Sequence, residues 1–118
     1  MQAHVTGTAG GGVSNLTINT TGAVTVGAVG TDIGTITITN SGGTTFSSTV
    51  SAATVAITST TVGNTVSFNG NLTLTSGMTV GAGSAAYNVA ILGSSNSIAG
   101  ATTFSNTGTV TLGDGSDA

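Results

Sequence analysis

The chain alternates apolar and polar residues in short segments, which are separated by turns rich in glycine and serine. Residues 34–40, Gly-Thr-Ile-Thr-Ile-Thr-Asn, form the most regular of these segments. Alternation with a period of two is the pattern of a β-strand with one buried and one exposed face. No longer window shows helical periodicity, and the abundance of threonine, valine and isoleucine disfavours helix. We therefore predict an all-β protein.

A pair of apolar residues separated by one position recurs along the chain. The pairs are Leu16/Ile18, Ile36/Ile38, Val55/Ile57, Leu72/Leu74, Val89/Ile91 and Val110/Leu112. Their first members lie 20, 19, 17, 17 and 21 residues apart, and the average of about 19 is in the range of stacked-coil folds. The residue before each pair is always asparagine or threonine. These matching flanks indicate a true repeat.

A coil of this length cannot bury its own apolar face, but it can do so when stacked on its neighbours. We therefore predict a parallel β-helix (β-solenoid) of about six coils of roughly 19 residues, with about 4.8 Å between coils. Residues 13–118 are assigned to the coils, without caps. Residues 1–12 are a glycine-rich segment that is either frayed or part of a preceding coil.

The repeat also assigns a facing to each position. The second apolar residue of each pair is predicted to form one inward core stack: Ile18, Ile38, Ile57, Leu74, Ile91 and Leu112. The residue before each pair is predicted to form an outward ladder: Asn15, Thr35, Thr54, Asn71, Asn88 and Thr109. Like polar side chains stacked along an axis hydrogen-bond to one another. The hydroxyl row of residues 34–40 thus has a structural interpretation.

The composition excludes several partners. The chain has no lysine or arginine, and its formal net charge is −3. Neutralising phosphate requires cationic side chains, so we expect no binding to nucleic acid or to anionic membrane surfaces. No apolar run approaches the roughly 18 residues of a membrane span, so we expect no membrane insertion. No signal peptide is visible at the start of the sequence.

Residues able to perform catalysis are scarce. His4 is the single histidine, and no carboxylate or nucleophile lies near it in sequence, whereas a general base must be held within reach of its partner. We therefore expect no enzyme, no catalytic residues and no cofactor. The four aromatic residues are interpreted as core or corner fillers: Phe46, Phe68, Tyr87 and Phe104.

The aspartates are the remaining candidates for a site. Asp114 and Asp117, in Gly-Asp-Gly-Ser-Asp, are candidate calcium ligands, since calcium prefers carboxylate and carbonyl oxygens. The run lacks the EF-hand spacing, so a plain turn is the alternative. Asp32 is interpreted as a turn residue.

Two stretches carry a resemblance. Residues 66–75, Val-Ser-Phe-Asn-Gly-Asn-Leu-Thr-Leu-Thr, and residues 103–113, Thr-Phe-Ser-Asn-Thr-Gly-Thr-Val-Thr-Leu-Gly, resemble the β-strand repeats of large bacterial surface adhesins of the filamentous-haemagglutinin-like and autotransporter-like types. The resemblance implies a right-handed parallel β-helical stalk at the cell surface or outside the cell. Because the repeat pattern runs without caps, we expect the partners to be copies of the chain or adjoining coils of a longer chain, end to end. Surface-layer proteins are similarly rich in threonine, alanine and glycine, so a subunit of a surface lattice or sheath is an alternative.

Ice binding is an alternative from a different class. Regular Thr-x-Thr arrays on a flat solenoid face order water, and Thr35, Thr37 and Thr39 form such an array. The other coils depart from it, whereas an ice-binding face depends on strict repetition. A β-helical polysaccharide lyase is disfavoured because the chain lacks cations and clustered acids. The sequence therefore favours a non-enzymatic structural module.

Overall fold

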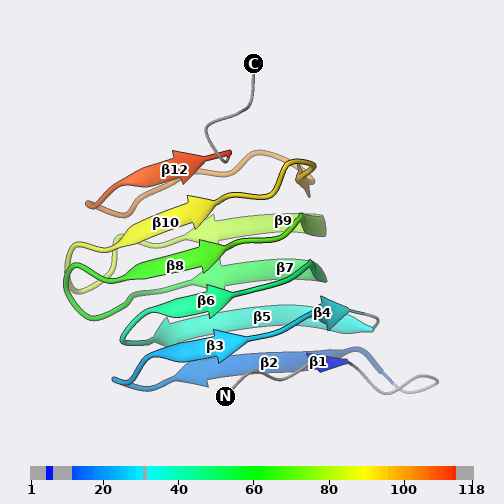
Figure 1. Ribbon diagram of the computed structural model, residues 1–118, viewed down its shortest axis with the longest axis horizontal. Helices are drawn as coiled ribbons and strands as arrows, with labels where there is room; N and C mark the ends of the chain where they lie inside the picture. Colours follow the sequence, from blue (N-terminus) through cyan, green and yellow to red (C-terminus); the bar gives the residue numbers. More distant parts are fainter. Residues whose placement is uncertain (1–4, 7–11, 31, 114–118) are drawn as a thin grey trace.

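The computed structural model describes residues 5–6, 12–30 and 32–113, which form a β-solenoid (Figure 1). These residues contain twelve strands, and each strand-to-strand pairing is parallel. The chain climbs through about 5 turns. No helix that could cross a membrane occurs in the described ranges. The predicted all-β parallel β-helix is confirmed.

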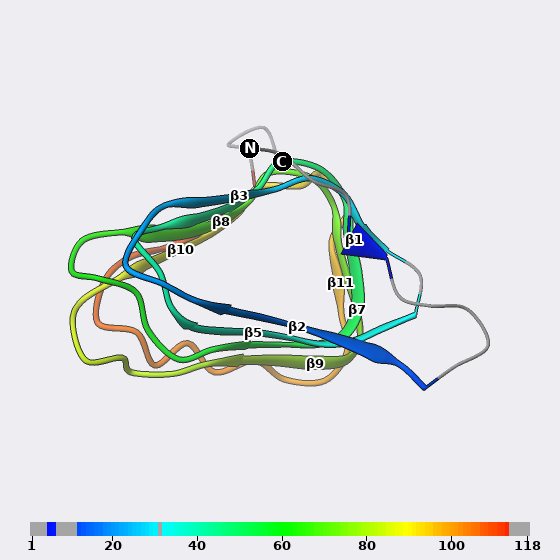
Figure 2. The same cartoon turned by 90° about the horizontal axis from the view of Figure 1, so that it is seen from below.

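Each complete turn runs through three faces, which are visible when the stack is viewed along its axis (Figure 2). Face 1 contains β2 (Ser14–Asn19), β5 (Ile33–Asn40) and the C-terminal halves of β7 (Val50–Ile57) and β9 (Leu72–Val80). Face 2 contains β3 (Val24–Val26), β6 (Thr44–Phe46), β8 (Thr65–Phe68), β10 (Asn88–Ile91) and β12 (Val110–Leu112). Face 3 contains β1 (Val5–Thr6), β4 (Val29–Gly30), β11 (Ser97–Ile98) and the N-terminal halves of β7 and β9.

Faces 1 and 3 belong to one seven-stranded sheet that bends around a corner, while face 2 is a separate five-stranded sheet. The bend lies where Ala52 pairs with Leu74 but Thr54 pairs with Gly77, so β9 carries one extra residue. Such a β-bulge bends the strand that contains it. Gly77 has φ 131, a left-handed conformation that favours glycine. The bulge therefore lets a single strand serve two faces.

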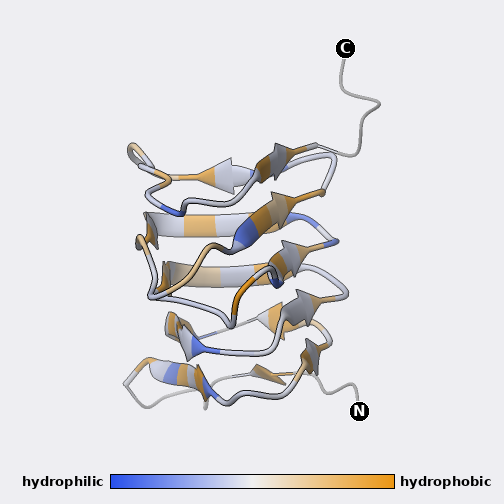
Figure 3. Cartoon of the chain, turned by 90° about the vertical axis from the view of Figure 1, so that its left-hand side faces the viewer, coloured by the Kyte–Doolittle hydropathy of each residue, from blue (hydrophilic) through white to orange (hydrophobic). Residues whose placement is uncertain are grey.

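The core consists of columns of side chains at equal register. Face 1 contributes the columns Leu16–Ile36–Val55–Met78 and Ile18–Ile38–Ile57–Val80. Face 2 contributes Val24–Thr44–Val66–Val89–Val110 and Val26–Phe46–Phe68–Ile91–Leu112. Face 3 contributes Val29–Val50–Leu72 and Ala52–Leu74–Ile98. Colouring by hydropathy shows apolar and polar residues alternating along the longer strands (Figure 3).

The rings of Phe46 and Phe68 show how one coil rests on the next. Their centroids lie 4.8 Å apart and their planes differ by 2°, which matches the spacing of neighbouring strands. Both side chains are fully buried, as is Tyr87, and Phe104 packs against the core. The interpretation of the aromatic residues as core or corner fillers is confirmed.

The predicted single core stack is wrong beyond its first three members. Ile18, Ile38 and Ile57 stack as predicted. Leu74 lies instead on face 3, and Ile91 and Leu112 lie on face 2. The reason is that apolar pairs occur on all three faces, so the nearest pair in sequence is not always the pair one coil above.

The observed strand pairing also shows that the coils are longer than the roughly 19 residues expected from the sequence. Stacked partners are separated by 19 residues between Ile36 and Val55 and by 24 between Thr73 and Ser97. About 5 turns therefore replace the expected six, with about 22 residues in each. In the N-terminal segment, Val5 and Thr6 pair with Val29 and Gly30, so these two residues extend the stack.

Candidate functional site

Asparagine side chains connect neighbouring coils. Asn15 Oδ1 accepts a hydrogen bond from Thr35 N at 2.8 Å, and Asn88 Oδ1 accepts one from Thr109 N at 2.9 Å. Thr35 also pairs with Thr54. The predicted outward ladder therefore exists as separate pieces, because Asn71 precedes β9 on face 3, Asn88 begins β10 on face 2 and Thr109 precedes β12 on face 2. These asparagines have a structural role.

The outward side of face 1 carries the threonines that suggested an ordered array. Its central row, read along the stack, is Thr17, Thr37, Ala56 and Thr79. In the row before it, Thr35 and Thr54 are followed by Gly77. The glycine and alanine remove hydroxyls from the middle of the face, and strict repetition is absent. Ice binding therefore gains no support from the corrected register.

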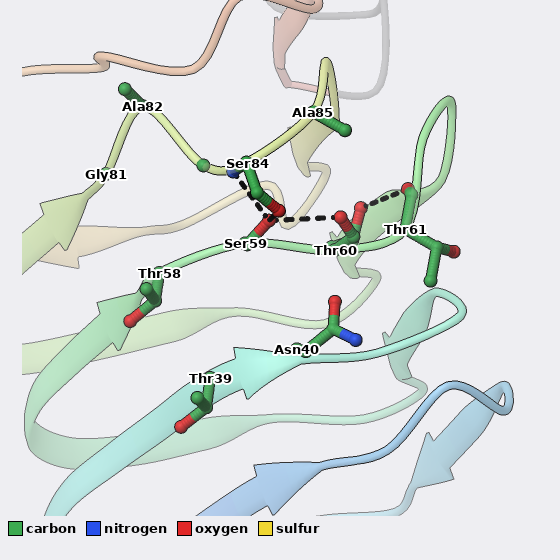
Figure 4. Close-up of a pocket in the computed structure, with 11 residues that line it drawn as sticks. Thr39, Asn40, Thr58, Ser59, Thr60, Thr61, Gly81, Ala82, Ser84 and Ala85 are labelled. Carbon is green, nitrogen blue, oxygen red and sulfur yellow. Dashed lines mark hydrogen bonds between the residues drawn. The ribbon is translucent and has the colours of Figure 1, made fainter.

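A groove lies at the corner where β5, β7 and β9 end, between face 1 and face 2. Its volume is about 560 Å³, which is within the range of pockets that hold small ligands. It is lined by Thr39, Asn40, Thr58, Ser59, Thr60, Thr61, Gly81, Ala82, Gly83, Ser84 and Ala85. These residues come from three successive coils (Figure 4). Every polar lining side chain is a hydroxyl or an amide, and none is charged.

The upper wall of the groove, residues 81–85, is held at several points. Ser84 N donates a hydrogen bond to Ser59 Oγ at 3.2 Å, and the Tyr87 hydroxyl donates to Gly81 O at 2.5 Å. Gly83 has φ 76, and a Cβ added there would lie 2.8 Å from Cε1 of Tyr87. The wall therefore needs glycine at this position and is fixed in place without a ligand.

The floor of the groove contains hydroxyls that are already engaged. Ser59 Oγ donates to Thr60 O at 3.0 Å, and Thr60 Oγ1 donates to Thr61 O at 2.8 Å. Asn64 Nδ2 donates to Thr61 Oγ1. Ser59 and Thr60 are buried. These bonds satisfy buried polar groups locally, so the floor is structural.

The lower rim differs, because its polar side chains are free. The side chains of Thr39, Asn40 and Thr58 have no hydrogen-bond partner among the described residues. Figure 4 shows the Asn40 amide directed from β5 toward the segment 58–61. Two hydroxyls and an amide are thus available to a ligand in the groove.

The structure describes one of the four residues that the sequence offered as candidates for a base, a turn or a calcium site. Asp32 lies at the corner before β5 with φ 62, and Ser14 N donates a hydrogen bond to its carbonyl at 2.9 Å, so it is a turn residue as predicted. His4 and the calcium candidates Asp114 and Asp117 lie outside the described residues. Within the described ranges, no three His, Cys, Asp or Glu side chains gather in a way that could hold a metal ion.

The chain matches no protein-family model, no curated protein and no solved structure. The basis for inferring a function is therefore the geometry of the solenoid and the resemblance of its repeats to those of bacterial surface adhesins. The groove was not predicted from the sequence. Its sequence signal is that the connections 58–64 and 81–87 are longer than the corresponding connections 20–23 and 41–43, and that their groove-lining residues are small or carry hydroxyls.

Proposed function

We propose that this chain is a non-enzymatic structural module of a bacterial extracellular adhesin or fibre, and that its function is mechanical. In such a module, stacked coils form a stiff rod that spaces or assembles other parts. Each coil rests on the next through parallel backbone hydrogen bonds and columns of apolar side chains. The style of the repeat supports the extracellular location.

The proposal rests mainly on the exposed strand edge of the last coil among the described residues. Strand β12 pairs with β10 alone within the described ranges. Its apolar side chains Val110 and Leu112 are 38% and 65% exposed. An exposed strand edge flanked by apolar residues favours the addition of another strand. The proposed partner is therefore a further coil, supplied by a longer chain or by a second copy.

The lateral faces support growth along the axis. Backbone pairing runs from coil to coil, so the sides of the stack present no strand edge. Their outward rows are mostly threonine, serine and asparagine, which water solvates. Association is thus favoured at the ends and disfavoured at the sides.

Sedimentation of the purified chain over a concentration series tests the proposal. We expect the wild type to form oligomers as the concentration rises, and Leu112→Asp to remain monomeric because a charge then lies at the end coil. The matched control is Val62→Asp, since Val62 is 74% exposed but lies in a lateral turn. This control should associate like the wild type. A wild type that stays monomeric at every concentration would refute the proposal.

A further inference from the structure

We infer that the corner groove is a binding site for an uncharged saccharide. The groove has about 560 Å³ of space, and its lining comes from the corner segments of three successive coils, so a coil added at the end of the stack does not cover it. It is therefore accessible in a single module and in a rod. This inference adds a ligand to the module and does not depend on its mechanical function.

The chemistry of the lining selects the class of ligand. The seven polar lining residues are threonine, serine or asparagine, and the other four are glycine or alanine. Hydroxyl and amide groups both donate and accept hydrogen bonds, which is the pattern of a sugar's own hydroxyls. A charged ligand would lose its hydration without gaining an opposite charge. An apolar ligand would find few apolar side chains of any size.

The free side chains of the rim provide the contacts. Thr39 and Thr58 occupy equivalent places at the ends of the face 1 strands in successive coils, and Asn40 lies beside them. A ligand bridging these residues would run along the stack, from β5 toward the wall at 81–85. The Asn40 amide supplies two donors and one acceptor oxygen, so it makes the largest single contribution to recognition.

Pre-organisation compensates in part for the small number of contacts. The bonds from Ser84 N to Ser59 Oγ and from the Tyr87 hydroxyl to Gly81 O hold the wall in its position. Binding therefore costs little ordering of the protein. No aromatic side chain lines the groove to stack on a sugar ring, so each site is expected to bind with a Kd of about 1 mM or weaker. Rods that repeat the site would gain avidity.

Amide NMR spectra of the full chain, titrated with sugars, test the inference. The probes are the neutral disaccharides lactose, cellobiose, mannobiose and diacetylchitobiose, with sialyllactose as a charged comparison. We expect at least one neutral disaccharide to give saturable shifts at Asn40, at 58–61 and at 81–85, at concentrations up to about 100 mM. Asn40→Ala should weaken this binding by about fivefold or more, because it removes both the neutral N–H donors and the carbonyl acceptor of the side-chain amide.

The controls separate recognition from structure. Asn19→Ala removes an exposed amide from the end of β2, outside the groove, and should bind as the wild type does. Thr58→Ala is a second groove variant, and its hydroxyl has no partner to lose within the described residues. The inference is overturned if no neutral disaccharide shifts the groove amides, if Asn40→Ala and Thr58→Ala bind normally, or if sialyllactose binds more tightly than lactose.

Discussion

Ile57 and Thr58 are adjacent in sequence but lie in opposite environments. Ile57 is 2% exposed and stacks between Ile38 and Val80, while Thr58 is exposed at the rim of the groove. Aspartate in place of Ile57 would bury a charge with no partner and remove apolar contacts with both neighbouring coils. We expect Ile57→Asp to lower the free energy of unfolding by about 4 kcal/mol.

Thr58→Asp serves as the control for this change. Its charge would remain in water, so its free energy of unfolding should stay within about 0.5 kcal/mol of the wild type. Denaturant unfolding of both variants gives the comparison. The opposite ranking would mean that the strand is shifted by one residue, which would exchange its buried and exposed faces.

Tyr87 links the groove wall to the pH dependence of stability. Burial raises the pKa of its phenol above the usual value of 10.0. The folded protein therefore keeps this proton to higher pH than the unfolded chain does. The resulting stability is complete below pH 10.0 and is lost as the pH rises above that value. No lysine, arginine, cysteine or second tyrosine is present in the sequence to titrate there.

We therefore expect the melting temperature to fall above pH 10.0, and this fall to be absent in Tyr87→Phe. Tyrosinate absorbance, recorded alongside thermal melts, follows the same group directly. A tyrosinate titration of the folded protein with its midpoint below pH 10.0 would contradict the assignment. The variant also loses the hydrogen bond to Gly81 O, so it should be less stable than the wild type at neutral pH by about 1 kcal/mol.

At the scale of the element, bridging asparagines replace backbone pairing where strands end. Leu72 N, at the start of β9, donates to Asn96 Oδ1 at 2.9 Å. Asn96 Nδ2 in turn donates to Gly93 O at 2.6 Å. Leu72 is fully buried beside Asn96, so its amide loses this hydrogen-bond partner when Asn96 is removed. We expect Asn96→Ala to cost about 2 kcal/mol of unfolding free energy.

The same substitution at Asn19 provides the comparison. Asn19 is exposed, and its side chain makes no hydrogen bond within the described part of the chain. Asn19→Ala should therefore have a free energy of unfolding close to that of the wild type. Equal losses for the two variants in thermal or denaturant unfolding would show that the bridge across coils is unimportant.

The elements also show how far the sequence alone was informative. Period-two alternation identified strands because one face of each strand is buried, and residues 34–40 lie within β5. The order of stacking was harder to predict, since Leu72/Leu74 has the same pattern as Val55/Ile57 but lies on another face. Which strands stack depends on where the chain turns corners, and the bulge at Gly77 leaves no clear signature in the sequence.

The groove could not be predicted for a related reason. It is formed by turns of three coils that come together only when the register is known. The alternation in residues 34–40 indicated that Thr39 faces outward, and the structure exposes both Thr39 and Thr58. It did not indicate that they lie beside the turn 81–85, because the pair expected above Val55/Ile57 was Leu72/Leu74, whereas the C-terminal half of β9 lies there and leads into this turn.

For the whole molecule, the account rests on the repetition of one interface. Each junction between coils contains parallel backbone pairing and the same columns of side chains. Strand β12 belongs to the last coil of the described residues, and its apolar side chains are exposed. A further coil placed there would make the same contacts again, with the spacing that Phe46 and Phe68 have within the chain.

Electron cryomicroscopy of the chain at high concentration tests this account most directly. We expect rods whose long axis is the solenoid axis, with a coil spacing of about 4.8 Å that continues across each junction between subunits. Leu112→Asp should abolish the rods, and Val62→Asp should leave them unchanged. Monodisperse single modules, or assemblies joined through faces 1, 2 or 3, would contradict the central claim that this solenoid is built to extend from its ends.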